Sequence, residues 1–290
     1  MGLNEKFFAS ATPAANSPDM SNATFVNAKT LTIGTRGFPR GAFISFDGTR
    51  LFTTHLDTSN NDWLQQYNFG TAFDVTTVGT VAKEKQLSAT ILSYMAGVSG
   101  NLDNTWITYD PYHNTEYYSQ PFGTAGDIST IGTLYTNDCT TRTTSDLYSQ
   151  TQMISKDGNK TFGLTGTPNM ITKTLSTNND LSSATTNCGT SVNVNSIGTS
   201  LGSTLSCFNF NQDGTKYYQF ARNAKVATFD LSTPWNVSTR SNQVTTDLSS
   251  ALGSPQYNYA LQFNNSYTKM IILTRNQTPS VTYKLQEFNL

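Results

Sequence analysis

Two polar segments of this sequence combine aromatic rings with amide and carboxylate groups, which are side chains suited to holding a sugar. An aromatic ring stacks on the apolar face of a pyranose, while amides and carboxylates bond its hydroxyl groups. The residues concerned are Asp57, Asn61 and Trp63 in the first segment, and Asp110, Tyr112, His113 and Asn114 in the second. These seven residues form a candidate binding face. The alternative is that Trp63 packs between repeats, His113 is an exposed loop histidine, and the polar side chains are merely solvated.

Catalytic carboxylates are not evident in the sequence. Glycoside hydrolysis requires two carboxyl groups that flank one bond of the substrate. Seven acidic residues recur at fixed turn positions, where an Asp side chain bonds its own backbone: Asp47, Asp103, Asp157 and Asp213 in one turn, and Asp74, Asp127 and Asp180 in another. No acidic residue falls on a strand expected to lie innermost. The sequence therefore predicts a protein that is not an enzyme.

Metal and cofactor sites are not expected either. His55 and His113 are the only histidines, and no two of the three cysteines lie at metal-ligand spacing. The sequence contains no glycine-rich phosphate loop and no calcium loop. It therefore predicts no metal and no cofactor. Cys139 and Cys188 lie in equivalent connections between repeats, and both a disulfide and two free thiols are compatible with their spacing.

The charge and hydropathy of the chain exclude two classes of partner. The net charge is −1 and only 13% of the residues are charged, so no electrostatic attraction to nucleic acid is expected. No run of about 18 apolar residues occurs, so the chain is not expected to insert into a membrane. Residues 1–20 are expected to form an arm that docks on a neighbouring subunit, and the alternative is a tail without a role.

A repeated pair of turns organises the rest of the chain. The first turn, Asp-Gly-Thr-Lys in its fullest form, recurs at residues 47–50, 103–106, 157–160, 213–216 and 265–269, with spacings of 56, 54, 56 and 52 residues. The second turn follows in step at residues 71–75, 124–128, 177–181 and 233–237. Asp-Gly between runs of alternating apolar residues is a strong hairpin signal. A period of this length with four strands in each unit is typical of a β-propeller blade.

The sequence therefore predicts an all-β fold, a five-bladed β-propeller of four-stranded antiparallel blades in one domain over residues 21–290. The blades are expected at residues 41–81, 98–135, 152–185, 206–244 and 258–290. Their fourth strands are expected to begin directly after the second turn, at residues 75–81, 128–135 and 181–185. The fifth copy lacks this strand, and residues 24–33 resemble it. An N-terminal strand is therefore expected to complete the last blade and close the ring.

The two faces of such a ring differ in sequence. The first and second turns of every blade lie on one face, which we call the turn face, and they are uniform. The loops between second and third strands and the links between blades lie on the other, which we call the loop face, and they vary in length. Variable loops on a rigid scaffold commonly carry binding, so the candidate binding face is expected there.

The repeat resembles a known family. Asp213-Gly214-Thr215-Lys216 and the run LSTPWNVST at residues 231–239 resemble the propeller repeats of tail and other structural proteins of bacteriophages. The resemblance covers nearly all of residues 21–290. It departs in blade two, where Asn104 and Trp106 replace Gly and Lys, and in blade five, where Asn265-Ser266 replaces Asp-Gly.

This resemblance implies a non-enzymatic virion protein, such as a tail, fibre, appendage or decoration subunit, that acts as a rigid scaffold in the extracellular particle. Its partners would be other virion subunits, held through the N-terminal arm, and a glycan or protein of the host surface. No catalytic residue carries over, because the motif positions are turn and core residues. The alternative function is a lectin-like glycan-binding propeller or a glycoside hydrolase, which would need ligand contacts around the ring or carboxylates at its axis.

Overall fold

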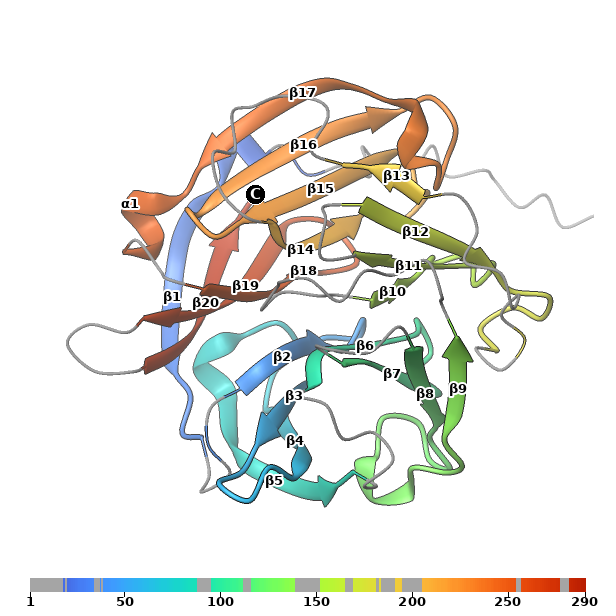
Figure 1. The fold of residues 1–290 in the computed structure, drawn as a ribbon. Helices are drawn as coiled ribbons and strands as arrows, with labels where there is room; N and C mark the ends of the chain where they lie inside the picture. Colours follow the sequence, from blue (N-terminus) through green and yellow to red (C-terminus); the bar gives the residue numbers. More distant parts are fainter. Residues whose placement is uncertain are drawn as a thin grey trace, which may run out of the picture.

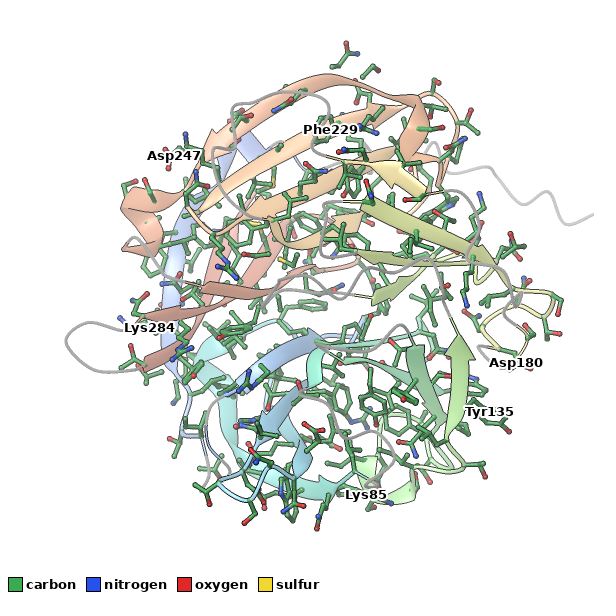
Figure 2. The ribbon with its side chains drawn as sticks, in the orientation of Figure 1. Lys85, Tyr135, Asp180, Phe229, Asp247 and Lys284 are labelled. Atoms are coloured by element: carbon green, nitrogen blue, oxygen red, sulfur yellow. The ribbon has the colours of Figure 1, made fainter. Side chains whose placement is uncertain are left out.

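The computed structural model describes residues 18, 20–33, 37, 39–87, 95–111, 116–138, 152–164, 169–180, 183, 191–194, 205–253, 257–276 and 282–290. These residues form five antiparallel four-stranded sheets around a central axis (Figure 1). The predicted five-bladed β-propeller is confirmed. Lys85, Asp180, Asp247 and Lys284 lie at the periphery of the ring, whereas the fully buried Phe229 lies inside blade four (Figure 2). None of the described helices is long and apolar enough to cross a bilayer.

Each of the first four blades runs outward from the axis in sequence order. Blade one consists of β2 (Pro39–Ile44), β3 (Arg50–Leu56), β4 (Asp62–Phe69) and β5 (Val78–Gln86). Blade two consists of β6 (Met95–Gly100), β7 (Trp106–Pro111), β8 (Glu116–Pro121) and β9 (Tyr135–Asp138). Blade three consists of β10 (Gln152–Ile154), β11 (Lys160–Leu164), β12 (Asn169–Thr174) and β13 (Ser191–Asn193). Blade four consists of β14 (Leu205–Phe210), β15 (Lys216–Ala221), β16 (Lys225–Leu231) and β17 (Arg240–Asp247).

Blade five joins the two ends of the described chain. Its inner strands are β18 (Tyr257–Phe263), β19 (Lys269–Asn276) and β20 (Thr282–Asn289), and its outermost strand is β1 (Thr24–Thr30). β1 pairs antiparallel with β20, from Thr24 opposite Asn289 to Thr30 opposite Lys284. The predicted closure by an N-terminal strand is therefore confirmed. The short helices η1 (Met20–Asn22) and α1 (Ser249–Leu252) precede β1 and β18.

The fourth strands begin later than the sequence predicted. In blades one, two and four the residues after the second turn form one 3-10 turn, in η2 (Val75–Thr77), η4 (Ile128–Thr130) and η7 (Val237–Thr239). Each is capped by the preceding Asp or Asn, as Asp74 accepts from the Thr76 amide over 3.0 Å. The cap satisfies a backbone N–H group that would otherwise pair with a neighbouring strand. The β-branched residues after the cap therefore form a 3-10 turn and not an extended strand.

Blade three departs furthest from the prediction. Its outer strand is β13, which lies between the ranges predicted for blades three and four, whereas the strand predicted at residues 181–185 falls almost wholly outside the described residues. Of those five residues only Ser183 is described. Its hydroxyl donates to Asp180 O over 2.6 Å, as the Thr77 hydroxyl does to Asp74 O over 2.8 Å, so blade three keeps the second turn and delays the strand.

The two turns of a blade stack on each other at the turn face. In blade one the Phe73 amide donates to Gly48 O over 3.0 Å, and a Cβ atom on Gly48 would lie 2.1 Å from the Phe73 ring. Blade four places Trp235 over Gly214 in the same way, where a Cβ would lie 2.3 Å from the indole. Both glycines have a positive φ, 70° and 71°. The Asp-Gly turn thus needs its glycine for two reasons, the backbone conformation and the ring above it.

We expect Gly214→Ala to lower the free energy of unfolding by at least about 2 kcal/mol, because it adds left-handed strain and displaces a packed indole. Gly253→Ala is the matched control. Gly253 also has a positive φ, 67°, but nothing lies within 4 Å of its Cβ position, so only the strain of about 1 kcal/mol applies. Urea unfolding followed by circular dichroism measures both. Equal losses in the two variants would show that the stacking of the turns contributes nothing.

Blade five contains a turn that the sequence analysis placed one residue too early. Tyr267, and not Ser266, occupies the glycine position: its amide donates to Asn264 O over 3.0 Å, as that of Gly48 does to Ser45 O over 2.8 Å. Tyr267 has a φ of 54° and is 5% exposed. Its ring packs 5.8 Å from that of Phe263. The turn therefore tolerates a side chain in the left-handed conformation where that side chain is itself buried.

Candidate functional site

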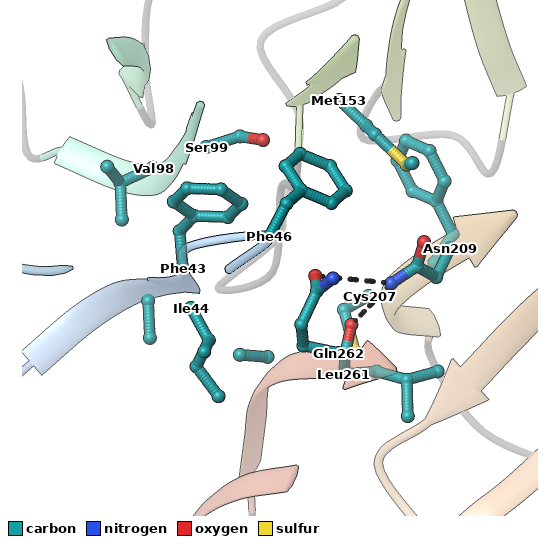
Figure 3. Close-up of a pocket in the computed structure, with 13 residues that line it drawn as sticks. Phe43, Ile44, Phe46, Val98, Ser99, Met153, Cys207, Asn209, Leu261 and Gln262 are labelled. Atoms are coloured by element: carbon teal, nitrogen blue, oxygen red, sulfur yellow. Dashed lines mark hydrogen bonds between the residues drawn. The ribbon is translucent and has the colours of Figure 1, made fainter. Parts of the chain in front are cut away.

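The central axis is the place where a propeller of this kind would hold substrate, and here it is filled by side chains. All five inner strands contribute to its lining, including Phe43 and Phe46 from blade one, Met153 from blade three and Cys207 from blade four (Figure 3). The remaining cavity has a volume of about 30 Å³, which is about the volume of one water molecule. Among the residues that the structure describes, the axis therefore leaves no room for a sugar or a lactone.

The polar groups of the axis bond one another. Asn209 Nδ2 donates to Leu261 O over 2.8 Å and lies 3.5 Å from Gln262 Oε1 (Figure 3). Both side chains are at least 95% buried. No Asp or Glu occurs in the five inner strands as the structure defines them. The axis within the described residues thus lacks the pair of carboxyl groups that glycoside hydrolysis requires.

Lys156 caps the axis at the turn face. Its Nζ donates to Tyr267 Oη over 3.1 Å and lies 5.6 Å from the centroid of the Phe46 ring and 5.1 Å from that of Tyr267. Burial lowers the pKa of Lys156 to about 8, while the two rings favour its charged form. No carboxylate of the described residues pairs with this amine, so Lys156 does not form the carboxyl pair of a glycosidase. Lys156 could not be identified from the sequence alone. The side chains that it contacts belong to blades one and five, and the repeat of blade three does not show those contacts.

The first segment of the candidate binding face is brought together by one carboxylate. Asp57 accepts from the Asn61 amide over 2.8 Å, from the Trp63 indole over 2.9 Å and from the Ser59 amide over 2.8 Å. The hydrogen bonds from Asn61 and Trp63 lower the pKa of Asp57 to about 2. The three predicted residues are therefore neighbours, as expected for a site. Their polar groups are nevertheless used within the loop, which favours a structural role for this cluster.

The second segment of the candidate binding face falls mostly outside the described residues. Tyr112, His113 and Asn114 are among the residues that the structure does not describe, and Asp110 is described only as part of β7. Cys139 and Cys188 also lie outside the described residues. Cys207 is a buried free thiol on β14, and burial raises its pKa. Within the described residues no group of three His, Cys, Asp or Glu side chains is arranged to hold a metal.

His55 is an interior residue of blade one. It is 1% exposed, and its Nε2 lies 2.7 Å from Thr53 Oγ1 while its Nδ1 lies 3.2 Å from Gly37 O. A carbonyl oxygen only accepts, so Nδ1 carries the proton and Nε2 accepts from the Thr53 hydroxyl. Burial lowers the pKa of His55 to about 4. His55 is thus a neutral structural histidine, and no substrate can reach it to use it as a base.

No protein-family model matches the sequence, and no curated protein matches it. Solved structures of other proteins share its fold. A candidate 6-phosphogluconolactonase of Bacteroides uniformis is 14% identical over 88% of this chain and 74% of that protein, with a TM-score of 0.50. A second from Bacteroides fragilis is 14% identical over 87% and 68%, also with a TM-score of 0.50. At this identity the comparison shows that the chain has the fold of those proteins and nothing about its activity.

Proposed function

We propose that this protein is a non-enzymatic scaffold that binds partners through the surfaces of a rigid ring. The supporting observation is the closed axis. Side chains from all five blades fill it, the cavity that remains is about 30 Å³, and no carboxylate lies on the described inner strands. A ring joined through both ends of the chain and filled at its centre presents faces of fixed shape, which suits a structural or attachment role.

The more specific proposal is a bacteriophage virion subunit, such as a tail, fibre, appendage or decoration protein. It is supported by the resemblance of the repeat to phage structural proteins, strongest at residues 213–216 and 231–239. In this role the arm at residues 1–20 binds other virion subunits and the loop face contacts a host-surface glycan or protein. Antibodies against the purified protein should label intact particles of the phage that encodes it. Absence of the protein from purified particles contradicts the virion role.

Catalysis is tested directly with the lactone after which the structural neighbours are named and with substrates of glycoside hydrolases. The purified chain should leave 6-phosphogluconolactone and nitrophenyl glycosides at their uncatalysed rates of hydrolysis, because no acid–base pair faces a cavity at the axis. The Lys156→Met variant is the discriminating control. Turnover by the wild-type chain that disappears in this variant would overturn the scaffold proposal and place a reaction at the axis.

A further inference from the structure

A polar groove lies between blades one and two, away from the axis and on the turn face. Its walls include Arg50, Asn68 and Lys83 from blade one, and Thr124 and Asp127 from blade two. The volume is about 340 Å³, which lies at the lower end of the range of small-molecule sites. The groove is therefore large enough for one sugar ring.

The repeat itself shows that this groove is unusual. Arg50 occupies the position that holds Lys216 in blade four and Lys269 in blade five. In those blades the third strand supplies a carboxylate: Lys216 Nζ lies 2.7 Å from Asp230 and Lys269 Nζ lies 2.6 Å from Glu287.

Blade one has amides at the same two positions. Asn68 stands opposite Arg50, as Asp230 stands opposite Lys216, and Gln66 takes the place of Glu287. Gln66 donates to Asn68 Oδ1 over 3.0 Å and accepts from the Ile128 amide over 3.3 Å, so it joins the two blades without a charge. Among the described residues, the Arg50 guanidinium forms no ion pair and no hydrogen bond.

The second turn of blade two brings its backbone close to Arg50, which is half-buried. The position that holds Phe73 in blade one and Trp235 in blade four is Gly126 in blade two. A Cβ atom on Gly126 would lie 2.4 Å from Arg50 Nη1. The first turn of blade two has Asn104 where the first turns of blades one, three and four have glycine, and Asn104 also has a positive φ, 56°. Both exchanges depart from the repeat, and the guanidinium of Arg50 lies where a side chain at residue 126 would begin.

Four charged side chains lie in or beside the groove, and among them Arg50 forms no ion pair and no side-chain hydrogen bond with any described residue. Lys83 Nζ lies 2.5 Å from Asp127 Oδ2, so these two charges neutralise each other and form one wall. Asp47 is a second nearby carboxylate. Although burial opposes its ionisation, hydrogen bonds from Ser45 and Thr49 and the charge of Arg50 lower the pKa of Asp47. The Asp47 oxygens accept hydrogen bonds from Ser45, Thr49 and Asn104. Asp47 therefore accepts none of the five N–H groups of the Arg50 guanidinium.

We propose that this groove binds an acidic saccharide, with the carboxylate of a uronic or sialic acid on Arg50. A planar guanidinium binds a carboxylate through two parallel hydrogen bonds. The Asn68 amide and the Thr124 hydroxyl stand on opposite walls and supply partners for the sugar hydroxyls. The site is independent of the virion role, since it requires only the junction of blades one and two.

The test is a titration of the purified full chain with glucuronate, galacturonate and N-acetylneuraminate, followed by saturation-transfer NMR and calorimetry. We expect at least one of these acids to bind, with glucose and galactose at least tenfold weaker. Arg50→Gln should weaken binding at least tenfold. Asn68→Asp should do the same, because it places beside Arg50 the carboxylate that blade four carries at Asp230. Lys160→Gln, at the same position in blade three, should leave the affinity unchanged.

Two results would overturn the proposal. One is the absence of binding by the wild-type chain, or equal binding by Asn68→Asp, which changes one atom of an exposed side chain and should leave the fold intact. The other is displacement of the acidic sugar by equimolar inorganic phosphate, which would show a bare oxyanion site. Neither result bears on the scaffold proposal, which depends on the axis and on particle labelling.

Discussion

Removal of residues 1–30 should prevent the chain from folding. These residues include β1, and without it the outer edge of β20 loses its partner along the whole register from Thr24 to Thr30. Phe288 would also lose its edge-to-face contact with Phe25, whose ring centroid lies 5.8 Å away. We expect a loss of at least about 5 kcal/mol, which equals the total stability of many domains. Circular dichroism and urea unfolding measure the effect.

Two further variants separate the effect of ring closure from the effect of chain length. Removal of residues 1–17 should leave the free energy of unfolding within about 0.5 kcal/mol of the wild-type value, since β1 remains. A circular permutant that joins Leu290 to Ser21 by a short linker, with new ends between blades two and three, should also fold, because Thr24 already lies opposite Asn289. A folded, monomeric chain lacking residues 1–30 would show that β1 is an accessory strand and does not close the ring.

The architecture was predictable because each blade repeats the same local chemistry. Asp213 accepts from the Thr215 amide over 3.1 Å and Asp103 from the Thr105 amide over 3.1 Å, so one turn is specified by one short motif wherever it recurs. Local motifs of this kind can be recognised in a sequence without knowledge of the tertiary structure. The delayed fourth strands were not predictable in the same way, since β-branched residues after Asp74 and Asp127 fit either a strand or a capped turn.

The candidate site was harder to predict because its geometry is decided between blades. Asp57, Asn61 and Trp63 are close in sequence, and the structure brings them together. Lys156 and Arg50 instead owe their positions to neighbours from other blades. A signal for Arg50 was nevertheless present. Comparison of equivalent positions in the five copies shows an amide at residue 68 where blade four has Asp230, and a glycine at residue 126 where blade one has an aromatic ring.

Acid should destabilise the protein through His55 before its carboxylates titrate. Burial holds the pKa of His55 at about 4 in the folded state, against 6.5 when it is exposed. The unfolded chain therefore binds more protons between these values. The stabilisation is complete above pH 6.5 and is lost as the pH falls towards 4. The shift corresponds to about 3 kcal/mol in the free energy of unfolding. Urea unfolding at pH 7.5, 5.5 and 4.5 measures this loss.

Replacement of each histidine assigns the effect. His55→Gln removes the titrating ring, so its stability should be nearly independent of pH across this window, although lower at pH 7.5 because Gln fits the bonds to Thr53 and Gly37 less well. His113→Gln, which alters the other histidine of the chain, should keep the wild-type slope. The lowered pKa values of Asp57 and Asp127, both about 2, confine their contribution to lower pH, since it is present above about 3.8 and lost only below it. A wild-type profile that stays level from pH 7.5 to 4.5 would mean that His55 is exposed to solvent, and with it the interior of blade one.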